Sequence, residues 1–181
     1  NQVVYTANQE LYSVPIDGSS VPIKLNSTLV SGGMVNSYQI TTDNSMVVYY
    51  ADQDTGDVYE LYSVPLNGGA MPIKLNSTLV SGGMVWSYNI SADSSRVVYD
   101  ADQDIDGVNE LYGVPVDGST LPEKLNDTLT SGGDVQAFQI SPNNNWVVYT
   151  ADQDADEVIE LYAFGEPPDE VFKQYLPIIS K

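Results

Sequence analysis

The sequence repeats itself with a period of 50 residues, and no other feature constrains its fold as strongly. The string PIKLNSTLVSGGMV occupies residues 22–35 and returns unchanged at residues 72–85. A looser copy, PEKLNDTLTSGGDV, occupies residues 122–135. A fixed period of this length exceeds that of common helical repeats. The chain is therefore predicted to be an array of similar structural units that stack on one another.

Each unit is predicted to hold four short strands and no helix. The tripeptides VVY and ELY are predicted to lie in the second and third strands. Asp117-Gly118 predicts the hairpin turn before the fourth strand, because such a turn needs residues with positive φ and Asp-Gly is favoured there. Both tripeptides place apolar residues at adjacent positions, so both faces of each sheet are expected to be buried, as in blades stacked face to face. In the third unit the first strand contains Val85, Tyr88 and Ile90, and the others are residues 97–100, 110–114 and 121–125.

The chain divides into four units and a tail. The units are residues 1–30, 31–80, 81–130 and 131–165, and a proline-rich linker with a C-terminal tail strand follows at residues 166–181. The first unit begins at its second strand, and the fourth unit departs from the pattern after its third strand. The four units are therefore predicted to hold three, four, four and three strands, which makes fourteen strands or about 3.5 blades. An open array of this kind exposes apolar blade faces and unpaired strand edges, which must be covered.

The order of motifs within a unit resembles the TolB-type β-propeller repeat, a relative of the WD repeat. A polar turn, VVY, an acidic hairpin, ELYSVP, an Asp-Gly turn and KLN follow in this order, and the resemblance covers residues 1–164. The Pro-Asp-Gly turn usual before VVY is replaced by TTDNS, SADSS and SPNNN. The resemblance implies an all-β fold of four-stranded antiparallel blades and an extracellular or cell-surface location. Such propellers serve as binding platforms, peptidase lids and assembly parts, so the resemblance leaves the function open.

The composition excludes several classes of function. The 25 acidic and 6 basic side chains give a net charge of −19, which argues against nucleic-acid binding because phosphate recognition needs clustered lysine and arginine. The chain has no cysteine or histidine, which excludes thiolate and imidazole metal sites and Ser-His-Asp triads. No run approaches the ~20 apolar residues that span a bilayer, so membrane insertion is not expected. Paired carboxylates occur in glycosidases, but here the acidic residues recur with the repeat, and we expect no enzymatic activity.

The acidic hairpins between the second and third strands predict calcium sites. In the third unit, oxygen ligands stand at alternate positions, on Asp102, Asp104, Asp106 and Glu110. Hard oxygen ligands in this pattern suit Ca²⁺ better than a transition metal. The sister hairpins contribute Asp52, Asp54 and Asp57 in the second unit, and Asp152, Asp154 and Asp156 in the fourth. The alternative is a solvated hairpin whose aspartates favour turns and keep a sheet edge soluble.

Glycosylation sequons recur with the repeat. They begin at Asn26, Asn76 and Asn126, and a fourth begins at Asn89. In an extracellular setting such sequons accept glycan on surface turns. The alternative is that the asparagine of KLN ends the fourth strand as a turn-forming residue.

Three residues break the repeat. Trp86 replaces Asn36 and Gln136, while Arg96 and Trp146 share a position with Met46. One interpretation is an aromatic platform for a sugar or a peptide. The other, which we favour, is that each of these side chains packs on a neighbouring blade.

The tail VFKQYLPII forms the last hydrophobic segment of the chain. It either folds back on its own chain as a substitute strand or adds to the open edge of another copy. The side chains predicted to mediate this self-association are Val171, Phe172, Tyr175, Leu176, Ile178 and Ile179.

The sequence thus favours a non-enzymatic extracellular structural or interaction protein whose partners are other copies of itself, assembled head to tail into a ring or filament. Calcium is the one candidate cofactor, and a glycan is a further candidate partner. The alternatives are a soluble glycan- or peptide-binding propeller module and a propeller domain excised from a larger secreted enzyme.

Overall fold

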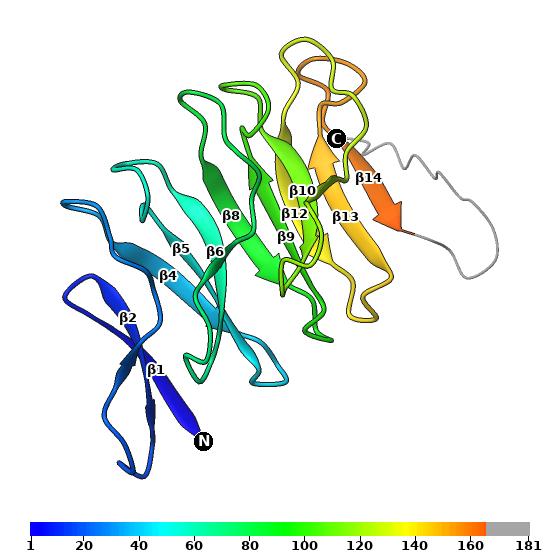
Figure 1. Cartoon of the computed structure of the whole chain (residues 1–181). Helices are drawn as coiled ribbons and strands as arrows, with labels where there is room; N and C mark the ends of the chain where they lie inside the picture. The colour runs from blue at the N-terminus through cyan, green and yellow to red at the C-terminus, as the bar shows by residue number, and fades with distance from the viewer. Residues whose placement is uncertain (166–181) are drawn as a thin grey trace.

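The computed structural model describes residues 1–165, which form fourteen β-strands and no helix. The strands make four antiparallel sheets that stand one after another like the blades of an open fan (Figure 1). No helix in this described range is long and apolar enough to cross a membrane. The prediction of an all-β fold built from propeller-type blades is confirmed.

The four blades follow the chain in order, with each strand paired to the next. Blade 1 contains β1 (Gln2–Ala7), β2 (Glu10–Pro15) and β3 (Ile23–Lys24); blade 2 contains β4 (Val35–Ile40), β5 (Met46–Ala51), β6 (Glu60–Pro65) and β7 (Ile73–Lys74). Blade 3 contains β8 (Val85–Ile90), β9 (Arg96–Ala101), β10 (Glu110–Pro115) and β11 (Glu123–Lys124); blade 4 contains β12 (Val135–Ile140), β13 (Trp146–Ala151) and β14 (Glu160–Gly165).

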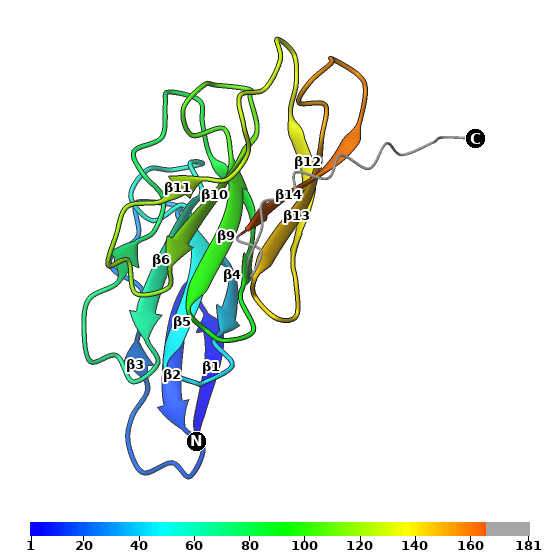
Figure 2. The same ribbon diagram turned by 90° about the vertical axis from the view of Figure 1, so that its right-hand side faces the viewer.

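The inner blades bury both faces, as the adjacent apolar residues of VVY predict. Val97 and Val98 are both fully buried although they point to opposite faces of β9. Val97 packs in one cluster with Val48 of blade 2, and Val98 packs in another with Val147 of blade 4. Successive blades therefore interlock through the two valines of the same motif, and the blades lie face to face when seen from the side (Figure 2).

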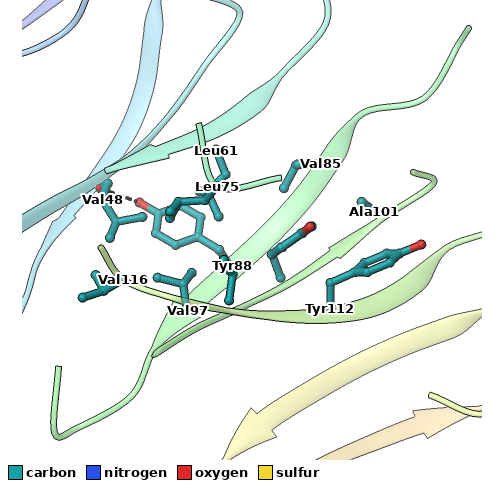
Figure 3. Packing of buried hydrophobic residues seen from close by; sticks show 11 residues of the cluster. Val48, Leu61, Leu75, Val85, Tyr88, Val97, Ala101, Tyr112 and Val116 are labelled. Carbon is teal, nitrogen blue, oxygen red and sulfur yellow. Dashed lines mark hydrogen bonds between the residues drawn. The ribbon is translucent and has the colours of Figure 1, made fainter. Parts of the chain in front are cut away.

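Tyrosines complete each joint between blades. In every blade the tyrosine of VVY stacks on the tyrosine of ELY, with ring centroids 5.1 to 5.6 Å apart, because the register places the two residues opposite each other. Tyr88 reaches from blade 3 into the preceding blade, where its hydroxyl donates to the carbonyl of Val48 over 3.3 Å (Figure 3). The core is thus a series of joints rather than one central cluster.

The fourth strands are shorter than predicted. The sequence favoured residues 121–125, whereas β11 covers only Glu123–Lys124. Pro122 has no N–H for the ladder, and Leu121 is 83% exposed. Beyond Lys124 the N–H of Leu125 still donates to the carbonyl of Leu111 over 2.8 Å, and Asn126 Oδ1 accepts the N–H of Leu111 over 2.7 Å.

Candidate functional site

The first aspartate of each acidic hairpin fastens the hairpin to the segment that enters the blade. Asp102 Oδ1 accepts the backbone N–H of Met84 over 2.6 Å, and its Oδ2 accepts that of Gly107 over 3.3 Å. Asp52 and Asp152 make the same pair of contacts in blades 2 and 4. Both carboxylate oxygens of these three residues therefore bond to backbone amides of the protein itself.

The glutamine after this aspartate connects successive blades. Gln103 Oε1 accepts the backbone N–H of Ser77 over 2.9 Å and the hydroxyl of Tyr99 over 2.9 Å. Its carbonyl accepts the N–H of Val80 over 3.0 Å. Gln53 repeats the pattern with Ser27 at 3.0 Å. Because Ser77 and Val80 follow the last strand of blade 2, this glutamine ties the connection between blades to the blade that it enters.

Sequence reasoning missed this role of the glutamines, although a signal was present. The string ADQD is unchanged at residues 51–54, 101–104 and 151–154, whereas the first unit reads ANQE at residues 7–10. There the strands meet in a tight turn with φ of 50° at Asn8 and 71° at Gln9. The full motif thus occurs in the three blades that have a preceding blade within this sequence.

The second aspartate of the hairpin holds a lysine of the fourth strand. Lys124 Nζ lies 2.8 Å from Asp104 and 2.7 Å from Glu110, and it sits 5.7 Å from the centre of the Tyr112 ring. Lys74 makes the same three contacts in blade 2. The hydrogen bond from Lys124 lowers the pKa of Asp104. Burial lowers the pKa of Lys124, but its bonds to Asp104 and Glu110 outweigh this effect, so the pKa is raised.

The carboxylates predicted to bind calcium are therefore engaged separately. Asp102 bonds to amides, Asp104 and Glu110 bond to Lys124, and the Asp106 carboxylate lies beside Gly82. Within residues 1–165 no group of three or more acidic side chains converges so that it could hold a metal ion. The residues present do not fit a calcium site in this conformation, and calcium binding stays a prediction that needs experiment.

The repeated sequon asparagines are structural residues. Asn26, Asn76 and Asn126 are buried; each Oδ1 accepts a leucine N–H, and each Nδ2 donates to the carbonyl of the next residue. A glycan replaces one of the two hydrogens on Nδ2, and because these side chains are buried, the sugar needs a path out of the fold. Asn89, in contrast, is exposed on β8. Glycosylation stays a prediction, and Asn89 is the one of the four sequons whose side chain is accessible.

The residues that break the repeat do not form one platform. Trp86 stands beside Val85, which pairs with Ala101 at the end of β9, whereas Arg96 and Trp146 begin β9 and β13. Trp86 and Trp146 therefore lie at opposite ends of the blades. The Arg96 guanidinium pairs with Glu123 at 3.1 Å and lies 5.7 Å from the Phe164 ring of blade 4. For Arg96, packing on the neighbouring blade is confirmed.

Within residues 1–165, the two end blades each leave one face without a neighbouring blade. On blade 1 the open face carries Ile16, which is 70% exposed, whereas its counterparts Leu66 and Val116 are 8% exposed. Val3 on the same face is 39% exposed, although the equivalent valines of blades 2 and 3 are fully buried. On blade 4 the open face carries Val148 and Leu161, which are half-buried. We call these surfaces the leading face, with Val3, Tyr5, Tyr12, Val14 and Ile16, and the trailing face, with Val148 and Leu161.

The tail residues predicted to mediate self-association lie outside the described part of the chain. They are Val171, Phe172, Tyr175, Leu176, Ile178 and Ile179.

Comparison with known proteins identifies the fold. No protein-family model and no curated protein matches the sequence. A puromycin-hydrolyzing peptidase of Mycobacterium tuberculosis matches in structure with a TM-score of 0.61 and 15% identity, over 97% of this chain and 28% of that one. An oligogalacturonate lyase from Vibrio parahaemolyticus matches with a TM-score of 0.59 and 12% identity, over 96% of this chain and 49% of that one. At such identities the likeness shows a propeller-type fold alone.

The chain spans less than half of the length of these two enzymes. A TolB-like protein from Agrobacterium tumefaciens also matches, at 14% identity over 90% of this chain and 71% of that one, but its TM-score of 0.35 carries no argument. The propeller part of the predicted resemblance is confirmed, and the finer TolB-type assignment stays a prediction.

Proposed function

We propose that this chain is a non-enzymatic structural and interaction module of the cell surface or extracellular space that joins copies of itself head to tail. The observation that carries the proposal is the complementarity of its two open faces. Each inner joint places a trailing face, such as Val48 with Leu61, against a leading face, such as Val97 with Tyr112. The open trailing face of blade 4 and the open leading face of blade 1 are the two halves of that same joint.

The open edge of blade 4 supports a further contact in the assembly. Asp154 and Glu160 repeat the carboxylates that hold Lys74 and Lys124, yet no lysine of residues 1–165 pairs with them. β14 also has no strand on its outer side within the described residues. Both features favour the addition of a lysine-bearing extended segment, and Lys173 of the tail of a neighbouring copy has the required chemistry.

The proposal is tested by measuring the size of the particle with sedimentation velocity at several salt concentrations. With a net charge of −19 the copies repel one another, so association through apolar faces strengthens as salt rises. Ile16→Asp on the leading face is expected to give monomers under conditions in which the native chain associates. Leu121→Asp is the matched control, because Leu121 is exposed on a hairpin away from the open faces.

A native chain that is monomeric at every salt and protein concentration contradicts the proposal. Equal loss of association in Ile16→Asp and Leu121→Asp contradicts the assigned interface. Deletion of residues 171–181 tests the tail separately, because the faces remain while the added strand is removed.

A second candidate is a propeller domain that accompanies an enzyme. It is favoured by the short share, 28%, of the matched peptidase that this chain spans. Native mass spectrometry of the protein from its source discriminates between the two, because an enzyme-borne domain has a far larger subunit mass and a self-associating module has multiples of one mass.

A further inference from the structure

A set of repeat-breaking residues converges where blade 3 meets blade 4. Aligning the units shows Asp100 where blade 2 has Tyr50, and Asn109 where blade 2 has Tyr59. Asp134 stands where the preceding joint has Met84. The internal symmetry of the array is therefore broken at one joint by residues that come from three different segments.

The equivalent place between blades 2 and 3 is filled by aromatic rings. Tyr50 and Tyr59 stack with centroids 4.8 Å apart, and the Tyr50 hydroxyl donates to the carbonyl of Val85 over 2.9 Å. In blade 3 two shorter side chains replace them, since Asn109 Nδ2 donates to Asp100 Oδ2 over 2.9 Å. The same Nδ2 donates to the carbonyl of Val135, also over 2.9 Å. Because blade 3 lacks the two tyrosine rings of blade 2, a hollow is present here, and polar side chains stand where blade 2 has aromatic ones.

This hollow, here called the Trp86 hollow, is lined by one aromatic residue together with acidic and amide residues. Among the residues that the structure describes, Trp86 is 53% exposed, which is a large exposure for an indole. The lining residues are Trp86, Asp102, Gly107, Asn109, Asp134, Val135 and Gln136, and none of them is basic. The hollow therefore combines the face of an indole with the negative charges of two carboxylates.

One acceptor at this site has no donor. Asn109 Oδ1 is buried and has no hydrogen-bond partner among the described residues, although its Nδ2 has two. Asp134 Oδ1 accepts the N–H of Asn109 over 2.6 Å. A buried acceptor without a partner is unfavourable and rare in folded proteins, so this joint is packed less favourably than the joint that Tyr50 and Tyr59 fill.

We propose that the Trp86 hollow binds an ammonium or guanidinium group, carried by a small amine or by a basic side chain of a peptide. The Trp86 indole attracts the cation, and the Asp134 carboxylate supplies the opposite charge. A metal ion is a poorer fit, because the acidic groups of residues 1–165 do not converge in threes. The site uses none of the residues of the leading and trailing faces, so it stands or fails independently of the self-association proposed above.

The test uses the full chain with Trp146→Phe, which leaves Trp86 as the only indole. The probe is Nα-acetyl-lysine methyl amide, and the comparison probes are the neutral norleucine analogue and glucose. We expect a saturable change in Trp86 fluorescence with the lysine probe that weakens as salt rises. Asp134→Asn keeps the bond to the N–H of Asn109 but removes the charge, so binding is expected to weaken at least about fivefold. Asp117→Asn, in an exposed turn, is the matched control and leaves binding unchanged.

A second variant tests the hollow without removing its ring. Asp100→Tyr combined with Asn109→Tyr restores the aromatic pair of blade 2, and we expect it to fold and to lose binding of the lysine probe. Glucose or the norleucine analogue binding as tightly as the lysine probe overturns the proposal, and so does unchanged binding in Asp134→Asn. Retained binding in the refilled variant overturns the assignment to this hollow.

Discussion

The side-chain oxygen of Gln103 accepts a 2.9 Å hydrogen bond from the backbone N–H of Ser77, which belongs to the segment leaving blade 2. The same oxygen accepts the hydroxyl of Tyr99, a fully buried ring in the core of the joint. One buried amide therefore couples the path of the chain between two blades to the packing between them. The orientation of successive blades depends on this polar contact as well as on the interlocking valines.

Replacement of Gln103 by Met is expected to weaken the joint between blades 2 and 3. Methionine has a similar length but leaves the N–H of Ser77 and the hydroxyl of Tyr99 without their acceptor. An unsatisfied buried donor costs about 1–3 kcal/mol, so the free energy of unfolding should fall by at least that amount. Urea denaturation measures it. Gln139→Met, at an exposed position of β12, is the control and should change stability by less than about 0.5 kcal/mol.

The ion pair between Asp104 and Lys124 predicts a dependence of stability on pH. The folded-state pKa of Asp104 is lowered below its ordinary value of 3.8, mainly by the hydrogen bond from Lys124. Its contribution is therefore complete above pH 3.8 and is lost as the pH falls through the lowered pKa. We expect Asp104→Asn to melt at a lower temperature than the native chain at pH 7, with the difference closing toward pH 2. A difference that persists at pH 2 contradicts this origin.

The same contacts bear on calcium. Asp104 and Glu110 both bond to Lys124, which offsets one of their two negative charges, and calcium binding requires them to release it. If these ion pairs persist, the melting temperature is equal in excess chelator and in millimolar Ca²⁺. A melting temperature that rises with Ca²⁺ and no longer does so in Asp104→Asn supports instead the calcium site predicted from the hairpin sequence.

The sequence predicted the blades well because repetition and adjacent apolar residues are local signals. The adjacent valines Val97 and Val98 predict that both faces of their sheet are buried, even when the residues that cover them are not yet known. The sites were harder to predict because they depend on contacts between distant residues. Asp104 and Asp106 look like neighbouring ligands along the chain, yet Asp104 points to Lys124, twenty residues away. Comparison of the units at every position would have found Asp100, Asn109 and Asp134, whose convergence only the fold reveals.

The Arg96 guanidinium occupies the space that a side chain at Gly113 would fill, so changing the glycine alone is expected to destabilise blade 3. A Cβ atom at Gly113 would stand 2.6 Å from the Arg96 guanidinium, so a side chain at residue 113 must displace it from Glu123 and from the Phe164 ring. Blade 2 has Met46 and Ser63 at these positions. Because the guanidinium is the far end of a flexible side chain, Gly113→Ser alone is expected to cost the contacts that Arg96 gives up, about 0.5–1 kcal/mol of unfolding free energy.

The double variant Arg96→Met with Gly113→Ser recreates the pair of blade 2 and should be about as stable as either single variant, because all three lack the contacts of Arg96 with Glu123 and Phe164. Denaturation of the native chain, both single variants and the double variant gives a coupling energy between the two positions. A favourable coupling of about 0.5–1 kcal/mol is expected, because each single variant loses the contacts of Arg96 and the double variant loses them only once. Additive effects of the two substitutions would show instead that the guanidinium moves aside at no cost, and that the glycine is not required by its neighbour.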